Sequence, residues 1–192
     1  QGDQNFVNLL SRVRLNQQTT YDIKAINQCS ITSERVANKG YTYLTTHNQK
    51  AIQINIDQLK KCDGVLFKYP AKIEGEFPEK LYPTDNVIEL KQNAQIIFLR
   101  NDKSGRNRYY NGKMGCVSRL NKDEIWIKFD DSSEIQIQRE FWENKNYILN
   151  GQQVEEETVG RFMQFPIKLA WAITIHKSQG LTLKRAVLDI KN

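Results

Sequence analysis

Residues 165–180 read FPIKLAWAITIHKSQG, an apolar run that ends in a dense group of polar side chains and a glycine. The group offers hydroxyl, imidazole, ammonium and amide functions from Thr174, His176, Lys177, Ser178 and Gln179. Donors of this kind, on a loop held by a rigid element, suit contacts to phosphate and sugar. The same letters also suit a plain helix end, with Gly180 as the cap and two basic side chains placed favourably against the helix dipole. The residues alone leave both interpretations open.

The sequence around this run alternates between helical and extended patterns, which predicts an α/β fold. Apolar residues at helical spacing predict helices over residues 6–15 and 20–26, and again from Asn48 to Leu59. Before Asn48, the β-branched and aromatic run YTYLTT predicts a buried strand at 41–46. Further strands are expected at 65–77, as a pair within 88–102, and at 185–190, where RAVLDI predicts a final buried strand.

Between residues 101 and 164 the pattern changes to short alternating strands separated by turn residues. The strands are expected in GKMGCVSRL (112–120), EIWIKFD (124–130) and SEIQIQREF (133–141). Three or more such strands with one apolar face close or pack to hide their edges, so we expect a small antiparallel β-barrel. We therefore predict one larger α/β domain from residues 1–100 and 165–192, interrupted by an inserted barrel domain at 101–164.

Composition narrows the class of protein. The chain has 192 residues, 39% hydrophobic and 26% charged, which is enough apolar side chain for a folded core. Its net charge of +6 favours an acidic partner such as nucleic acid, although many basic proteins bind nothing acidic. Three widely spaced cysteines, without a CxxC pair, argue against a disulfide framework and a zinc site. No apolar run approaches the roughly 20 residues that span a bilayer, so we expect a soluble chain with no membrane partner, cytoplasmic and nucleoid-associated if the source is prokaryotic.

The string LAWAITIHKSQGLT (169–182) resembles motif V of the PIF-type and RecD-like DNA helicases, the 5′-to-3′ branch of helicase superfamily one. Residues 1–14 are similar to the segment after that family's Arg-Gln pair, and YTYLTTHNQKAIQIN (41–55) is similar to its "LTT-N…A…IN" motif. Residues 73–79 and 90–102 resemble the next landmarks, and NRYYNGKMGCV (107–117) resembles the turn into an inserted barrel. These strings follow the order that they have in the family.

The resemblance implies a motor of two RecA-like domains, with ATP in the cleft between them and single-stranded DNA across both. This chain would be the second RecA-like domain with an inserted Src-homology-three-like barrel. Its partners would be single-stranded DNA and the N-terminal RecA-like domain of the same parent. The implied DNA contacts are Thr45, Thr46 and Asn48 in one segment and Thr174, His176, Lys177 and Ser178 in the other. Gln1, Gln179 and Gly180 are implied to lie on the nucleotide side.

Several of these residues have other interpretations. Thr45 and Thr46 can simply end a strand, with Asn48 capping the next helix. A stretch on the barrel rim, Arg106, Arg108, Tyr109, Tyr110 and Lys113, can stack bases and neutralise phosphates, or form a solvated hairpin with locally packed tyrosines. We interpret Trp126 and Trp171 as core residues, and the acidic run 155–157 as a solvent-facing strand or turn.

Motors that transfer phosphoryl groups need a glycine-rich loop ending in Gly-Lys-Ser/Thr, and this sequence has no such loop. We therefore expect no catalytic residue in the chain, an inactive isolated fragment, and ATP and Mg²⁺ as cofactors of a longer parent. The leading hypothesis is the C-terminal motor part of an ATP-dependent 5′-to-3′ DNA helicase. The alternatives are a non-enzymatic adaptor or domain that binds single-stranded nucleic acid, and the helicase part of a conjugative relaxase. A phosphate loop upstream and an "ALSR" string downstream would favour the motor.

Overall fold

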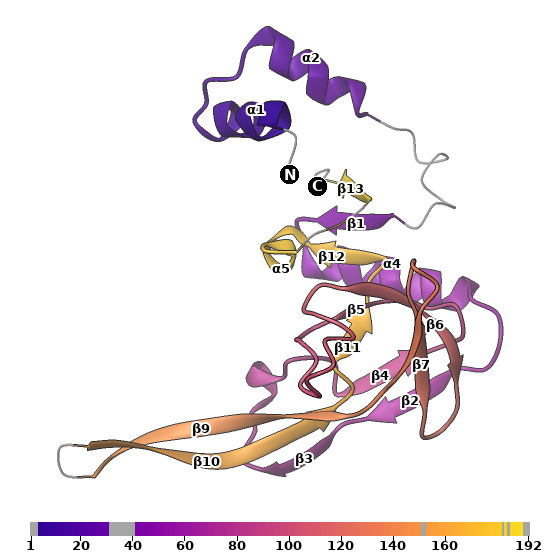
Figure 1. The fold of residues 1–192 in the computed structure, drawn as a ribbon, viewed down its shortest axis with the longest axis vertical. Coiled ribbons are helices and arrows are strands. Elements are labelled where there is room, and N and C mark those ends of the chain that lie inside the picture. Colours follow the sequence, from indigo (N-terminus) through magenta and orange to yellow (C-terminus); the bar gives the residue numbers. More distant parts are fainter. Residues whose placement is uncertain (1–3, 31–40, 151–152, 182, 184, 190–192) are drawn as a thin grey trace. The chain divides into compact units, whose positions relative to one another are not determined.

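The computed structural model describes residues 4–30, 41–150, 153–181, 183 and 185–189. The chain divides into two compact units, Gln1–Lys39 and Gly40–Asn192. Figure 1 shows two helices in the first unit and the described strands in the second.

The first unit contains α1 (Gln4–Arg14) and α2 (Thr20–Gln28), which confirms the two helices predicted at the start of the chain. Helix α2 begins with a capping box: the Thr19 hydroxyl accepts a hydrogen bond from the Asp22 amide, and the Asp22 carboxylate accepts one from the Thr19 amide. The Arg12 guanidinium of α1 binds the same carboxylate, so Asp22 also ties the two helices together. These hydrogen bonds, that from Arg12 first, hold the pKa of Asp22 well below its ordinary value.

A three-stranded parallel sheet lies in the second unit, in the order β12-β1-β13. Its strands are β1 (Thr42–Thr45), β12 (Ala172–Thr174) and β13 (Ala186–Asp189). Helix α4 (Asn48–Lys61) packs on β1 and β12. The predicted strand in RAVLDI is present, but its predicted burial is wrong: Leu188 is 60% exposed. The reason is its place, because β13 is an edge strand of the described sheet, whereas α4 packs mainly on β1 and β12.

A five-stranded antiparallel sheet runs in the order β11-β5-β6-β7-β8. The strands are β5 (Gln95–Phe98), β6 (Met114–Leu120), β7 (Ile125–Lys128), β8 (Glu134–Ile137) and β11 (Ile167–Leu169). The three predicted alternating strands are β6, β7 and β8, which pair as consecutive neighbours. Within the described residues, however, the sheet is open, with β11 and β8 at its edges, so it is not the closed barrel that was expected. The fold is α/β with one parallel sheet and several antiparallel ones.

This sheet also takes strands from both sides of the predicted insert, since β5 precedes residue 101 and β11 follows residue 164. The stretch at 165–180 explains how. Its first half forms β11 in the antiparallel sheet, and after Ala170 and Trp171 its second half forms β12 in the parallel sheet. The boundaries at 101 and 164 stay a prediction.

The remaining strands form two smaller sheets. Strand β2 (Phe67–Pro70) pairs with β4 (Val87–Leu90), and β3 (Lys72–Gly75) pairs with the long hairpin of β9 (Glu140–Asn150) and β10 (Gln153–Gln164), which projects as an arm in Figure 1. The single strand predicted at 65–77 is thus two strands in different sheets. The Ala71 amide still binds the Asn86 carbonyl in the register of β2 with β4, and from Lys72 onward the chain pairs with β10 instead. A short 3₁₀ helix, η1 (Glu79–Leu81), follows β3.

The core lies between the β2–β4 pair and the five-stranded sheet and includes Leu90, Phe98, Ile127 and Ile167. Trp171 packs against this core, as expected. Trp126 is half-buried instead, with the Arg119 guanidinium 4.0 Å above its ring. The acidic run at 155–157 lies on β10 with exposed side chains, which confirms the solvent-facing interpretation.

Candidate nucleic-acid interface

Two polar segments from the sequence analysis lie at the ends of neighbouring parallel strands. The first segment is Thr45–Asn48 and the second is Thr174–Gly180. In the register of β1 and β12, Thr45 lies opposite Thr174, so both strands end at the same level. Residues 46–48 lead from β1 into α4, and α5 (Ile175–Ser178) begins directly after β12. Both segments therefore lie at the carboxyl edge of one parallel sheet, the edge where open α/β sheets usually bind ligands.

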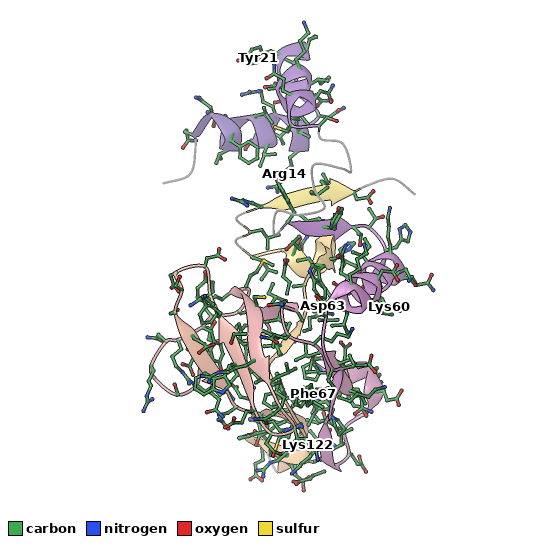
Figure 2. The ribbon with its side chains drawn as sticks, turned by 90° about the vertical axis from the view of Figure 1, so that its right-hand side faces the viewer. Arg14, Tyr21, Lys60, Asp63, Phe67 and Lys122 are labelled. Atoms are coloured by element: carbon green, nitrogen blue, oxygen red, sulfur yellow. The ribbon has the colours of Figure 1, made fainter. Side chains whose placement is uncertain are left out.

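The residues of the first segment differ in burial. Thr45 is fully buried, and its hydroxyl donates to the His47 carbonyl at 3.1 Å. Thr46, His47 and Asn48 are exposed, and the Thr46 hydroxyl lies 2.8 Å from His47 Nδ1. His47 is the residue before the helix, so Asn48 is the first residue of α4 and not its cap. Lys60 and Asp63, labelled in Figure 2, mark the opposite end of α4.

In the second segment, Thr174 is buried, whereas His176, Lys177, Gln179 and Gly180 are exposed. The Ser178 hydroxyl donates to the Ile175 carbonyl at 2.7 Å within the same turn. The interpretation as a plain helix end holds only for Ile175–Ser178, which form α5, because Ala172–Thr174 is a strand. Gly180 has a φ of +79°, as expected for the glycine that follows a helix end.

A cavity of about 560 Å³ adjoins both segments. Its lining includes Asn48 of α4 and Thr174, Lys177 and Gln179 of the second segment. Its apolar wall includes Ile52 and Ile56, so these exposed residues of α4 face the cavity. A second hollow of about 400 Å³ borders residues 82–86 and shares Lys177 with the first.

Lys168 lines both hollows together with Lys177, although the sequence analysis did not single it out. Burial, and then the nearby charge of Lys177, lowers the pKa of Lys168 below its ordinary value, while Asp85 acts in the opposite direction. The signal that could have found it is a charged residue inside the apolar run FPIKLAW.

Asn55 was also missed, although it ends the string YTYLTTHNQKAIQIN that carried the resemblance. It is a buried polar residue of α4. Its side-chain amide donates to the Ala172 carbonyl at 2.8 Å, and its side-chain oxygen accepts a hydrogen bond from the Ala172 amide at 2.9 Å. Asn55 thereby joins the helix of the first segment to the strand of the second.

Several side chains of the basic stretch at 106–113 make contacts within the protein. The Arg108 guanidinium forms two hydrogen bonds with the buried Asp102 carboxylate, at 2.8 and 3.1 Å. Lys113 donates to the Arg108 carbonyl, and its ammonium lies 3.6 Å from the centre of the Phe129 ring. Tyr109 is buried and stacks on Phe98, which leaves Arg106 and Tyr110 as the exposed members.

The remaining expectations concern the nucleotide, metals and membranes. Gln1 lies outside the described residues. The described residues hold no group of three or more side chains suited to a metal ion. Likewise, none of the helices in the described part of the chain is long and apolar enough to cross a membrane.

Comparison with known proteins gives a consistent result, although no family model matches the chain. The ATP-dependent DNA helicase Pif1 of Campylobacter jejuni is 31% identical over 171 residues, covering 78% of this chain and 36% of the relative. The Xenopus laevis helicase PIF1 is 30% identical over 192 residues, covering 95% of this chain and 28% of the relative. The chain thus spans about a third of the length of these curated relatives.

Solved structures agree with the sequence relatives. Bacteroides Pif1 in complex with ADP-AlF4 superposes with a TM-score of 0.87 at 32% identity, covering 98% of this chain and 43% of that protein. Bacteroides Pif1 bound to single-stranded DNA gives a TM-score of 0.72 over the same shares. With the motif strings in family order and both polar segments at one sheet edge, these matches show that the chain belongs to the Pif1-type helicase family.

Proposed function

We propose that this chain is the part of an ATP-dependent 5′-to-3′ DNA helicase that holds single-stranded DNA and forms one wall of the ATP cleft. The observation that carries the proposal is the register of Thr45 with Thr174, because it brings two polar segments to one sheet edge beside a cavity. The C. jejuni and X. laevis relatives are ATP-dependent DNA helicases by name. Bacteroides Pif1, similar over 98% of this chain, has been solved with single-stranded DNA and with ADP-AlF4.

In this proposal the exposed side chains make the DNA contacts. Thr46, Asn48, His176 and Lys177 can donate to, or attract, phosphate oxygens without reading the bases. Thr45 and Ser178 use their hydroxyls within the protein and Thr174 is buried, so these three shape the segments. Arg106 and Tyr110 are the rim residues with exposed side chains that could add to the track.

The nucleotide side of the proposal rests on Gln179 and Gly180, which are exposed beyond α5, and on Gln1. ATP and its Mg²⁺ would bind mainly to another RecA-like domain of the parent, because this sequence has no phosphate loop. The chain itself would be the second RecA-like domain, with the antiparallel strands that lie between residues 101 and 164 as the inserted barrel-like domain.

The test compares two lysine variants in binding to a fluorescently labelled oligothymidylate, followed by anisotropy at several salt concentrations. Lys177→Ala removes an exposed charge beside the cavity, and Lys122→Ala removes one from the turn between β6 and β7, labelled in Figure 2. We expect weak, salt-sensitive binding by the wild-type chain. Lys177→Ala should weaken it and lower the salt slope by about 0.7, the value for one phosphate on a single strand, while Lys122→Ala should leave both unchanged. Equal effects of the two variants, or no binding by the wild type, would refute the proposal.

A further inference from the structure

Asn55 occupies a position on α4 where an apolar side chain would be expected. The buried face of this helix consists of Ala51, Asn55 and Leu59, four residues apart from one another. Residues at this spacing lie above one another on one helical face. An apolar residue would fill the same space, so packing alone does not account for an amide here.

The side-chain amide of Asn55 forms hydrogen bonds with the backbone at the edge of the parallel sheet. Ala172 belongs to β12, an edge strand among the described residues, and its amide and carbonyl both bind Asn55, at 2.9 and 2.8 Å. One side chain therefore supplies the donor and the acceptor that a further strand would have supplied. Asparagine and glutamine carry both functions on one group, whereas aspartate has no donor at neutral pH and leucine has neither.

These two bonds fix the position of α4 along β12. Asn55 lies seven residues after Asn48, about two helical turns, and Ala172 lies two residues before Thr174. A slip of the helix along the strand would break both bonds and shift the residues at 46–48 relative to those at 174–178. Parallel pairing with β1 sets the ends of the strands, and an ion pair between Lys50 and Asp189, at 3.1 Å, ties α4 to β13; the two Asn55 bonds set the position of the helix against β12.

We infer that Asn55 is a positioning residue that sets the distance between the two DNA-binding segments, so that both can bind successive phosphates of one strand. This inference rests on the proposed function, since it concerns the same interface. Asn55 makes no direct DNA contact in this scheme, because it is buried.

The experiment uses Asn55→Leu and Asn55→Asp in the whole chain, with Ile137→Ala as a matched control. Ile137 is buried in β8, at the edge of the antiparallel sheet opposite β11, so its truncation destabilises the fold away from α4 and β12. Folding of each variant is first checked by urea titration. Oligothymidylate binding is then measured at a temperature and urea concentration where every variant is fully folded.

Both Asn55 variants should bind roughly tenfold more weakly and show a shallower salt dependence, by about 0.7 for each phosphate that the variant no longer neutralises. Ile137→Ala should bind like the wild type, however large its loss of stability. A folded Asn55→Leu with wild-type affinity and salt slope would overturn the inference while leaving the proposed function intact. So would an equal loss in Ile137→Ala. Failure of the wild-type chain to bind would instead defeat the proposed function.

Discussion

Arg108 offers a clear choice between a role in DNA binding and a role in the fold. Its sequence neighbours suggest a basic rim, but its guanidinium is committed to Asp102, which also accepts hydrogen bonds from the Ser104 and Arg108 amides at 3.0 and 3.1 Å. Asp102 therefore organises the loop from 102 to 108. We predict that Arg108→Ala damages this loop far more than it damages DNA binding.

The magnitude follows from the burial of the pair. The side chain of Asp102 is 1% exposed and that of Arg108 is 27% exposed. Removing one partner of a fully buried ion pair costs about 3–5 kcal/mol, because the other charge stays buried. Water can reach this pair from the arginine side and two amides still bind the carboxylate, so we expect a loss of about 2–3 kcal/mol. For a chain of this size that loss lowers Tm by roughly 5–10 °C.

The dependence of stability on pH gives a second test of the pair of Asp102 and Arg108. The hydrogen bonds from Arg108, the largest cause, hold the pKa of Asp102 well below its ordinary value. An aspartate with a lowered pKa in the folded state stabilises the fold above the unfolded pKa, near 3.9, and this contribution is lost as the pH falls through the folded value. Arg108→Ala should therefore flatten the decline in stability below about pH 4.

The measurements are urea denaturation at neutral and acidic pH and oligothymidylate binding well below Tm. Arg106→Ala, an exposed neighbour on the same stretch, is the control and should leave stability unchanged. If Arg108→Ala kept wild-type stability but bound DNA tenfold or more weakly, the residue would belong to the DNA track, and its assignment to the fold through Asp102 would be refuted.

Three further predictions concern single positions. Burial raises the pKa of Tyr69 to about 12, and its hydroxyl donates to the Asn121 carbonyl at 2.6 Å. The stability that Tyr69 contributes below about pH 10 should therefore be lost between about pH 10 and 12. In urea titrations over that range, the stability of Tyr69→Phe should decline less than that of the wild type. Gly160→Ala should destabilise the β10 bulge by about 1–3 kcal/mol, because a Cβ there would collide with the Glu76 carbonyl, and an unchanged urea midpoint would contradict this. Lys168→Met should lower the salt slope of DNA binding by about 0.7 without loss of stability, and an unaltered slope would exclude Lys168 from the interface.

The sequence predicted the elements near the interface well, because their signals are local. YTYLTT and the helix after it were recognised from β-branched residues and helical spacing, and both are present. The apolar half of residues 165–180 was ambiguous, since a short apolar run fits a buried helix and a buried strand equally. Its division into β11 and β12 depends on partners from distant parts of the chain, Ile96–Phe98 and Tyr43–Thr45.

Tertiary pairing also decided the side-chain roles that the sequence left open. Nothing in the spacing of Arg108 and Asp102 distinguishes an ion pair from two solvated charges, so the basic stretch at 106–113 seemed more available for DNA binding than it is. Asn55 looked like one polar residue among several on α4, because its partner is a backbone group 117 residues away. The expected barrel rested on three consecutive strands, whereas the sheet adds β5 and β11 and stays open in the described residues.

The order β12-β1-β13 places the first strand of the sheet between two of the last, and this arrangement constrains biosynthesis. The Thr42 hydroxyl donates to the Ala170 carbonyl, 128 residues further along the chain. At a translation rate of about 5–20 residues per second, β1 leaves the ribosome roughly 6–25 s before its neighbours exist. During that interval the nascent β1 has neither of its native neighbours, a state in which strands pair with the wrong chain. A chain that ends before residue 172 should therefore leave β1 without either of its native neighbours, and the sheet edge that we propose to bind DNA should not form.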